Sequence, residues 1–316
     1  MATKIFIDGA AGTTGLEIRE RLAARRDLVV VQLSDADRKD VNARKQALND
    51  AEIVILCLPD EAAKEAVARI ENPDVRVIDA SSAHRVAPGW VYGFAEFEPG
   101  NYDAVASATR LTNPGCYATG FVALVAPLIR AGLLPAETPL SVNAVSGYSG
   151  GGKAMIAEFE DRNSPDYTQT VVRSYALGLA HKHVPEMTGR SGLRHPPVFA
   201  PSVGRYYRGM IVEVPLHLWA LPGAPSGADL RAALADTYQG RPLVEVAGAA
   251  ETASLKTLDA EALKNTNRMK LHVFANESTR QVRLTAVLDN LGKGASGAAV
   301  QNLNLMLGLP ETTGLV

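Results

Sequence analysis

Near its start the sequence reads "KIFIDGAAGTTG", Lys4 to Gly15, and this stretch decides the fold. Lys4–Gly9 is a short apolar run that ends in glycine, and a helical pattern follows over Thr14–Arg25. Three glycines lie at the junction: Gly9, Gly12 and Gly15. Such a turn lets backbone N–H groups approach a pyrophosphate at the helix N-terminus. It is equally compatible with a tight turn that binds nothing, but its position after a first strand favours a dinucleotide site.

The alternation of strand and helix continues through the first third of the chain. Further strands are expected at Leu28–Ser34, Glu52–Pro59 and Val75–Ser81, with a helix over Asp60–Ile70. Strands that are apolar throughout are typical of a parallel sheet covered on both faces. The pattern therefore predicts a doubly wound α/β fold, in which ligands bind beyond the carboxyl ends of the strands.

The pattern changes after about Leu111. A helix is expected over Tyr117–Arg130, and the later segments "GRYYRGMIVEVPLHL" and "QVRLTAVLD" alternate in the manner of antiparallel strands. We therefore expect a dinucleotide-binding domain from residue 1 to residue 112. Residues 113–289 are expected to form an α+β domain with a mostly antiparallel sheet, and the pattern alone does not place the helix expected after them.

Bulk composition narrows the function classes. The 316 residues carry 32 Lys and Arg against 34 Asp and Glu, a net charge of −2, which gives no field to attract nucleic acid or an anionic membrane. The sequence has no apolar run of about 20 residues that would span a bilayer. Two cysteines are too few for a disulfide framework, and these properties together predict a cytoplasmic protein.

The residues after the second expected strand bear on the choice of coenzyme. An acidic residue at this position binds the ribose hydroxyls of NAD, whereas basic residues suit the extra phosphate of NADP. The segment "LSDADRKD" offers Asp35 and Asp37 but also a hydroxyl and two cations, which favours NADP over NAD or a mixed-charge surface loop. The expected coenzyme residues of the two turns are Gly9, Gly12, Thr13, Thr14, Gly15, Ser34, Arg38 and Lys39.

Cys116, in "LTNPGCYATG", is the candidate nucleophile. Pro114 and Gly115 force a turn just before it, and an apolar helix follows. The free N–H groups and the dipole of a helix N-terminus favour the thiolate form of a cysteine. A buried structural cysteine is the alternative, and it is the favoured interpretation for Cys57, which lies inside an expected strand.

A nucleophilic cysteine requires a proton acceptor, and "HKHVPEM" supplies candidates. Two histidines and one glutamate lack the four-ligand set of a zinc site, so no metal is expected. A solvated helix start is the other alternative. With Pro185 in a first helical turn, His183 is the candidate acid/base and Glu186 the residue that orients its ring.

The segment "VSGYSGGGKAMI", Val145 to Ile156, comes close to an ATP-binding P-loop. Gly147, Gly152 and Lys153 fit that motif, but Ala154 stands where it requires the Ser or Thr that holds Mg²⁺. The segment also follows an expected strand of the second domain rather than the first strand, so ATP binding is not expected.

Taken in order, six motifs resemble the short form of the N-acetyl-γ-glutamyl-phosphate reductase family, within the semialdehyde dehydrogenase superfamily. They are "DGAAGTTG", "DASSAHR", "LTNPGCYATG", "SGYSGGGK", "HKHVPEM" and "DNLGKGASGAAVQNLN", and they span nearly the whole chain. The resemblance implies NADPH-dependent reduction of N-acetyl-L-glutamyl 5-phosphate in arginine biosynthesis, through a thioester on Cys116. One departure is Lys182, where many relatives have Arg.

The resemblance also implies further site residues. His183 matches the acid/base histidine, and Arg85, Asn113 and His181 match positions around the substrate. Ser149 and Gly150, in the glycine-rich segment, are expected to approach the nicotinamide and the thioester. Asn290 and Lys293, in "DNLGKGA", match a segment near the nicotinamide end that returns to the coenzyme domain. The resemblance thus implies that residues 290–316 complete the domain of residues 1–112, and that residues 113–289 form the catalytic and oligomerisation domain.

Two other functions stay open at this stage. A sister reductase could act on aspartyl or aminoadipyl phosphate, and a non-catalytic NADP-binding sensor could carry an incidental thiol. For the enzyme, the resemblance implies a small acyl-phosphate substrate and a homo-oligomer, either a dimer or a tetramer.

Overall fold

The computed structural model describes residues 2–34 and 36–315, and they form two compact units. Unit 1 consists of the described residues of Met1–Ala95, Gly100–Pro114 and Ala295–Leu315. Unit 2 consists of Glu96–Pro99 and Gly115–Gly294. Unit 1 is therefore assembled from three separate stretches of sequence, and the last stretch returns to it after unit 2 is complete.

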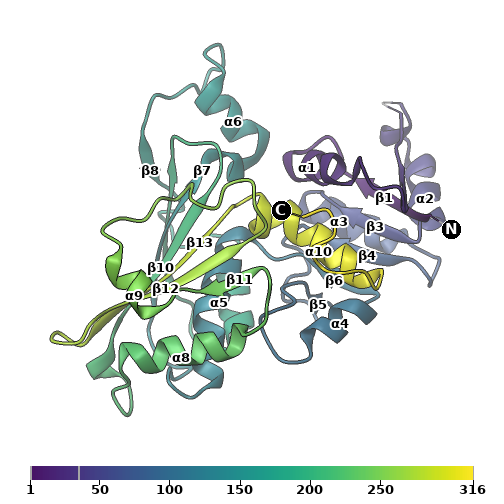
Figure 1. Cartoon of the computed structure of the whole chain (residues 1–316). Helices are drawn as coiled ribbons and strands as arrows, with labels where there is room; N and C mark the ends of the chain where they lie inside the picture. Colours follow the sequence, from purple (N-terminus) through teal and green to yellow (C-terminus); the bar gives the residue numbers. More distant parts are fainter. Residues whose placement is uncertain (1, 35, 316) are drawn as a thin grey trace. The chain divides into compact units, whose positions relative to one another are not determined.

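Unit 1 contains a six-stranded sheet in the order β2-β1-β3-β4-β6-β5, and its described strand pairs are all parallel (Figure 1). The predicted doubly wound sheet is confirmed. Its elements are β1 (Thr3–Asp8), α1 (Thr13–Leu22), β2 (Leu28–Val31), η1 (Asp37–Lys39), α2 (Val41–Asp50), β3 (Ile53–Leu56), α3 (Asp60–Ala68), β4 (Arg76–Asp79), β5 (Val91–Tyr92), α4 (Asn101–Ser107), β6 (Arg110–Thr112) and α10 (Gly297–Met306).

Alternating side chains of the central strands build two separate cores. On β1, Ile5 and Ile7 pack into a core with residues of α1, α4 and α10, whereas Phe6 packs with residues of α2 and α3. On β3, Ile53 joins the first core and Val54 the second. Because successive strand residues point to opposite faces, an unbroken apolar run needs helices on both sides. This explains why the strands read as continuously hydrophobic.

Three strands are shorter than expected. Strand β3 covers Ile53–Leu56 where Glu52–Pro59 is expected, and β4 covers Arg76–Asp79 where Val75–Ser81 is expected. The third is β2. The sequence pattern predicts a strand over Leu28–Ser34, but β2 ends at Val31. Val31 pairs with Phe6, and beyond Phe6 the register of β1 continues with β3 alone. Ser34 therefore lies outside the sheet, in the segment that leads to η1.

Unit 2 contains a seven-stranded sheet in the order β11-β12-β13-β10-β7-β9-β8. Four of its neighbouring pairs are antiparallel, and two, β11 with β12 and β7 with β9, are parallel, so the mostly antiparallel sheet is also confirmed. Its elements are α5 (Cys116–Arg130), β7 (Ser141–Gly147), η2 (Tyr148–Gly151), α6 (Gly152–Glu160), β8 (Val172–Ser174), α7 (Val184–Ser191), β9 (Val198–Gly204), β10 (Met210–His217), η3 (Leu218–Ala220), α8 (Gly227–Tyr238), β11 (Val244–Val246), α9 (Ala249–Ser254), β12 (Met269–Asn276), β13 (Gln281–Leu288) and the π-helical turn η4 (Gly292–Ser296).

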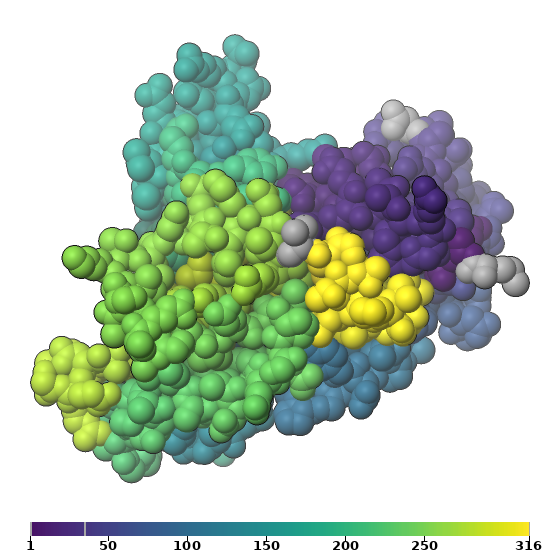
Figure 2. Space-filling view, viewed as in Figure 1, coloured from purple at the N-terminus to yellow at the C-terminus, as the bar shows by residue number. Residues whose placement is uncertain are grey.

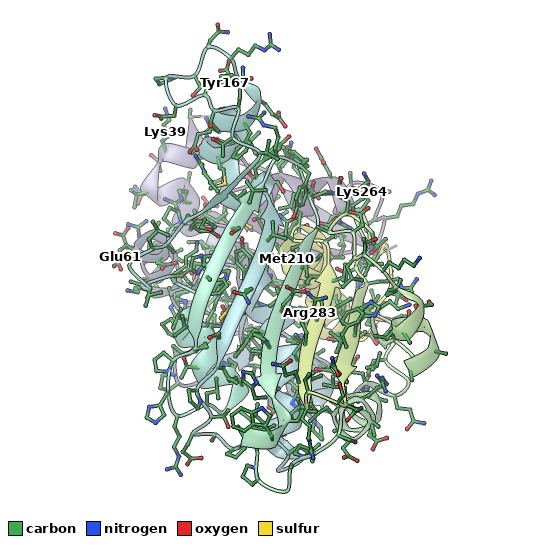
Figure 3. All side chains as sticks on the ribbon, turned by 90° about the vertical axis from the view of Figure 1, so that its left-hand side faces the viewer. Lys39, Glu61, Tyr167, Met210, Lys264 and Arg283 are labelled. Carbon is green, nitrogen blue, oxygen red and sulfur yellow. The ribbon has the colours of Figure 1, made fainter. Side chains whose placement is uncertain are left out.

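The two faces of this sheet differ. Helix α5, which is buried all round from Tyr117 to Leu128, packs with α8 against one face. Along β7, β9 and β10 buried residues alternate with more exposed ones, so the more exposed residues point to the other face. Figure 3 shows these strands toward the viewer without a covering helix. The segment with α6 and β8 forms one end of unit 2 (Figure 2). We expect this uncovered sheet face to take part in assembly.

Helix α10 returns the chain to unit 1. It packs against α4 and α1, and Arg25 donates a hydrogen bond to Asn304 at 2.8 Å. The sequence pattern alone did not fix this packing. Within residues 2–34 and 36–315, no helix is long and apolar enough to cross a bilayer.

Candidate active site

Cys116 is the first residue of α5, and the turn before it positions its thiol. Gly115 is the N-cap with extended backbone angles, φ −81° and ψ 145°. The cysteine is half-buried and is not part of a disulfide. A thiolate at this point faces the positive end of the helix dipole, which stabilises the charged, nucleophilic form.

A carboxylate ties the beginning of α5 to the beginning of α7. Glu186 lies in the first turn of α7, and its Oε1 accepts a hydrogen bond from the backbone N–H of Gly115 at 2.9 Å. Both groups are buried, and His183 is the N-cap residue of the same helix. Glu186 thus holds the backbone immediately before Cys116 to the helix that carries His183. Sequence reasoning expected it to orient the histidine ring.

Aromatic and imidazole rings cluster beside the cysteine. The ring centroids of His181 and His183 lie 4.7 Å apart, and each lies 5.8 Å from that of Tyr117. The Tyr175 hydroxyl donates to that of Tyr117 at 3.1 Å, and Tyr117 donates to the carbonyl oxygen of Ser202 at 3.2 Å. The structure therefore brings His181 and His183 together with two phenols that sequence reasoning missed.

Both phenols stay protonated at neutral pH. Burial raises the pKa of Tyr175 to about 12, and the neighbouring Cys116 adds to the rise. Burial, with further contributions from Tyr175 and Cys116, also holds the pKa of Tyr117 well above its usual value. Because a negative charge on Cys116 disfavours phenolate formation, the pair stays uncharged and adds no negative charge near the thiol.

The glycine-rich segment and the "DNLGKGA" segment meet within unit 2. Asn290 Nδ2 donates to the hydroxyl of Ser149 at 3.0 Å, and its Oδ1 accepts from the backbone N–H of Gly209 at 2.8 Å. A side chain at Gly150 would lie 3.4 Å from Asn290 Nδ2. Ser149, Gly150 and Asn290, which are predicted to face the coenzyme, are therefore neighbours. A hydrogen bond joins Ser149 to Asn290.

Gly294 lies directly against the candidate nucleophile. A Cβ atom at this position would come 2.7 Å from the Cβ of Cys116 and 3.1 Å from the carbonyl oxygen of Asp289. Its neighbour Lys293 is 1% exposed and donates to Glu96 at 2.6 Å, and that carboxylate is 2% exposed. The predicted nicotinamide-end residue Lys293 is therefore a member of a buried ion pair that anchors the segment touching Cys116.

A cavity of about 350 Å³ opens inside unit 2 beside these groups. Its lining residues are Tyr117, Ser146, Gly147, Gly150, Gly151, Gly152, Met155, Tyr175, His181, Lys182 and Val203. Among these described residues there is no carboxylate, and Lys182 is the one cationic side chain. The cavity therefore suits an anionic molecule with a small apolar part.

Unit 1 has its own cavity of about 510 Å³ at the carboxyl ends of β1 and β2. It is lined by Phe6, Ile7, Asp8, Gly9, Ala10, Ala11, Arg19, Val31, Gln32, Leu33, Ser34, Arg38, Arg44, Leu58 and Ala62. This is the position at which doubly wound sheets bind dinucleotides.

The glycine turn fits a dinucleotide. A Cβ at Gly9 would lie 2.3 Å from the carbonyl oxygen of Cys57, and one at Gly15 would lie 2.5 Å from that of Gly9, so both glycines are required by backbone packing. At Gly12 the nearest atom is 3.4 Å away, which leaves room beside the helix N-terminus. The buried hydroxyl of Thr13 has no hydrogen-bond partner among the described residues. Its neighbour Thr14 belongs to the same first turn of α1, and such a turn suits a phosphate oxygen.

Of the residues predicted to distinguish NADP from NAD, only some line this cavity. Ser34 and Arg38 line it, whereas Lys39 is not among its lining residues. The Ser34 hydroxyl donates to Asp37 at 2.7 Å, and Asp35 lies outside the described residues. Arg19 and Arg44 also line the cavity, and sequence reasoning missed both. They lie at positions that are typical of the polar face of any helix.

Two predicted substrate residues belong to unit 1. Arg85 is buried, and its guanidinium donates to the carbonyl oxygens of Asn113 and Ala80, both at 3.2 Å. The Asn113 side chain donates to the carbonyl of Ala295 at 2.9 Å and accepts from Asn302 at 3.1 Å. These bonds hold Asn113, which follows β6 and precedes Cys116 by three residues in the chain. No group of acidic, histidine or cysteine residues in the described ranges forms a metal site.

Two family models match these units. Residues 4–105 match the model of the semialdehyde dehydrogenase NAD-binding domain, and residues 116–290 match that of the semialdehyde dehydrogenase dimerisation domain. The chain therefore belongs to the semialdehyde dehydrogenase family of oxidoreductases.

Individual proteins match the chain over nearly its whole length. N-acetyl-gamma-glutamyl-phosphate reductases of Brucella ovis and Brucella suis are 55% identical over 309 residues, which cover 98% of this chain and 100% of each relative. In fold, the chain is similar to aspartate semialdehyde dehydrogenase II of Vibrio cholerae in complex with ASA, with a TM-score of 0.70 at 16% identity and coverage of 98% and 99%. A probable aspartate-semialdehyde dehydrogenase of Pseudomonas aeruginosa gives 0.69 at 18% identity, with coverage of 97% and 99%.

Proposed function

We propose that the protein catalyses the NADPH-dependent reduction of N-acetyl-L-glutamyl 5-phosphate to N-acetyl-L-glutamate 5-semialdehyde and inorganic phosphate, a step of arginine biosynthesis. The observation that carries this proposal is Cys116 at the beginning of α5, tied through Gly115 and Glu186 to the helix that begins at His183. The names of the relatives that are 55% identical support the substrate.

In the first step the Cys116 thiolate attacks the acyl carbon of the substrate. The C–S bond forms, the C–O bond to phosphorus breaks, and inorganic phosphate leaves with that electron pair. His183 takes up the thiol proton before the attack, as an acid/base paired with a nucleophile does. The product of this step is a thioester on Cys116.

The second step releases the product from the cysteine. A nicotinamide coenzyme, when bound by the glycine turn of unit 1, supplies the hydride that reduces the thioester carbon. His183 donates its proton to the oxygen of the resulting thiohemiacetal and takes it back as the C–S bond breaks. The semialdehyde leaves, and Cys116 is again a thiolate. The phenols of Tyr117 and Tyr175 stay uncharged beside the reacting sulfur, with Tyr175 donating to Tyr117 and Tyr117 donating to the carbonyl oxygen of Ser202.

The unit 2 cavity favours an N-acylated substrate over aspartyl phosphate. Aspartyl phosphate carries a free ammonium group, and binding it in a desolvated cavity requires a carboxylate nearby. The described lining has none, and it offers Lys182 for a substrate carboxylate and Met155 with Val203 for a methyl group. An acetylated amino acid matches that arrangement.

We also propose roles for the domains and for assembly. Residues 1–112 and 290–316 bind the coenzyme, and residues 113–289 carry catalysis and oligomerisation. The match of unit 2 to a dimerisation-domain model, together with its sheet face without a covering helix among the described residues, supports a homo-oligomer, either a dimer or a tetramer. The composition suits a cytoplasmic enzyme.

The test is a steady-state assay in the reverse direction. Each candidate semialdehyde is supplied with inorganic phosphate and NADP, and formation of NADPH is followed by absorbance. We expect turnover with N-acetyl-L-glutamate 5-semialdehyde and little with aspartate semialdehyde. A preference for aspartate semialdehyde would support the sister reductase. A protein that binds NADP but turns over neither semialdehyde would be a sensor.

A further inference from the structure

The unit 1 cavity has an excess of positive charge. Its lining includes three arginines from three different elements, Arg19 of α1, Arg38 of η1 and Arg44 of α2. Asp8 is the one carboxylate among the described lining residues, and Arg44 donates to it at 2.7 Å. This ion pair neutralises one arginine, and the described lining holds no second carboxylate.

Arg19 has the geometry of an anion ligand. It follows Gly15 by four residues on α1, so it lies on the helix face that meets the glycine turn. Helical side chains lean toward the helix N-terminus, which directs the guanidinium back over that turn. Arg19 is half-buried and has no hydrogen bond or ion pair with any described residue. By contrast, Arg21 on the same helix pairs with Glu17 at 3.7 Å.

Ser34, Arg38 and Lys39 are the residues that the sequence predicts to bind the additional phosphate of NADP. In the structure they are not sufficient for that task. Lys39 does not line the cavity, and the Ser34 hydroxyl already donates to Asp37. A pyrophosphate is served by backbone N–H groups at the N-terminus of α1 and needs no cation there. An arginine without a partner beside Arg38 therefore matches a second, separate phosphate group.

We propose that Arg19 binds the 2′-phosphate of NADPH and, with Arg38, sets the preference of the protein for NADPH over NADH. This inference rests on the proposed function, in which the coenzyme is NADPH. Arg44 is a positioning residue here, because its charge is bound to Asp8 at the end of β1. A planar guanidinium grips a phosphate with paired donors, which a lysine does not reproduce.

Direct binding tests the proposal without turnover. Dissociation constants for NADPH and NADH are measured by fluorescence titration, and those for adenosine 2′,5′-bisphosphate and 5′-AMP by calorimetry. Arg19→Gln should weaken NADPH and adenosine 2′,5′-bisphosphate about tenfold or more, the usual effect of a lost charge-assisted pair. Binding of NADH and 5′-AMP should change by less than about twofold. Arg21→Gln is the matched control on the same helix and should change neither.

Two further variants sharpen the result. Arg38→Gln should act like Arg19→Gln, whereas Lys39→Gln should leave the NADPH constant within about twofold. If Arg19→Gln lowers thermal stability, Arg19→Lys keeps the charge and should still weaken NADPH selectively. Equal loss for NADPH and NADH would place Arg19 at the pyrophosphate and overturn the proposal, as would an unchanged NADPH constant. If the unmodified protein binds neither dinucleotide, the proposed function fails as well.

Discussion

The two cysteines of this chain show how the surroundings of a thiol decide its chemistry. Each cysteine residue as a whole is half-buried, so it is the surroundings of the sulfur atom that distinguish the two. Cys57 follows β3, packs against the first core of unit 1, and lies near the carboxylates of Asp79 and Asp8. Burial and those two carboxylates raise its pKa to about 12. Cys116 begins a helix, next to two phenols and an imidazole pair. One thiol is held neutral, and the other is placed where a thiolate is stabilised.

The largest expected effect is the loss of Cys116. Cys116→Ser keeps the shape of the side chain but replaces the thiol with a hydroxyl that ionises far less readily, so turnover should fall by about 10⁴-fold or more. Coenzyme binding should persist, because the glycine turn belongs to unit 1. Cys57→Ser is the matched control, and its turnover should stay within about threefold, measured in the reverse assay. Equal losses of turnover in the two variants would contradict the proposed difference between the two cysteines.

The next largest effect concerns His183. His183→Asn removes the proton acceptor while retaining a polar side chain, and kcat should fall by about 10²–10⁴-fold. The Cys116→Ser and His183→Asn losses should not multiply in the double variant, because the two groups act as one unit. A double variant whose loss is the product of both single losses would show that the histidine acts independently of the thiol.

Thiol labelling compares the cysteines directly. At pH 8 a thiol of pKa about 12 is only about 10⁻⁴ thiolate, against roughly a quarter for an ordinary thiol. Iodoacetamide should therefore modify Cys116 at least about 10³-fold faster than Cys57, measured by peptide mass spectrometry. Since the raised pKa keeps Cys57 protonated, its rate should rise about tenfold per unit between pH 7 and pH 9. Comparable rates for both residues would contradict this account.

A smaller effect is expected at Gly294. A methyl group there would overlap the Cβ of Cys116, so Gly294→Ala must shift the nucleophile or the segment after β13. Displacements of this size commonly reduce kcat by about 10²-fold. Gly248→Ala is the comparison, because no neighbouring atom of the described residues lies within 4 Å of its Cβ position and its φ is −63°. A Gly294→Ala protein with unchanged kcat would show that the close approach to Cys116 is unnecessary.

The sequence predicts the fold class because its strongest signals are local. The apolar run of β1 needs a core on each face, and the glycines beside it fit one kind of turn, so the doubly wound sheet follows from a dozen residues. The position of Cys116 at the beginning of a helix follows in the same way, from the Pro-Gly turn before it. The family assignment from six motifs is confirmed by the family models and by the relatives at 55% identity.

The remaining features depend on residues that are distant in sequence. Glu186 bonds to a backbone group 71 positions away, and Lys293 pairs with Glu96 across 197 positions. Neither partner can be read from local periodicity, so these two contacts could not be predicted from the sequence. Arg19 looks like any arginine on a polar helix face until the cavity beside it is known.

The most direct test of the central claim is to trap the acyl group on the enzyme. N-acetyl-L-glutamate 5-semialdehyde and NADP are mixed with the protein in the absence of phosphate, so that the thioester forms but is not released by phosphorolysis. We predict a rapid burst of about one NADPH per active site and an acyl adduct on the peptide that contains Cys116. The Cys57 peptide should be unmodified, and Cys116→Ser should give no burst. A burst without an adduct on Cys116, or an adduct on another residue, would contradict the thioester mechanism.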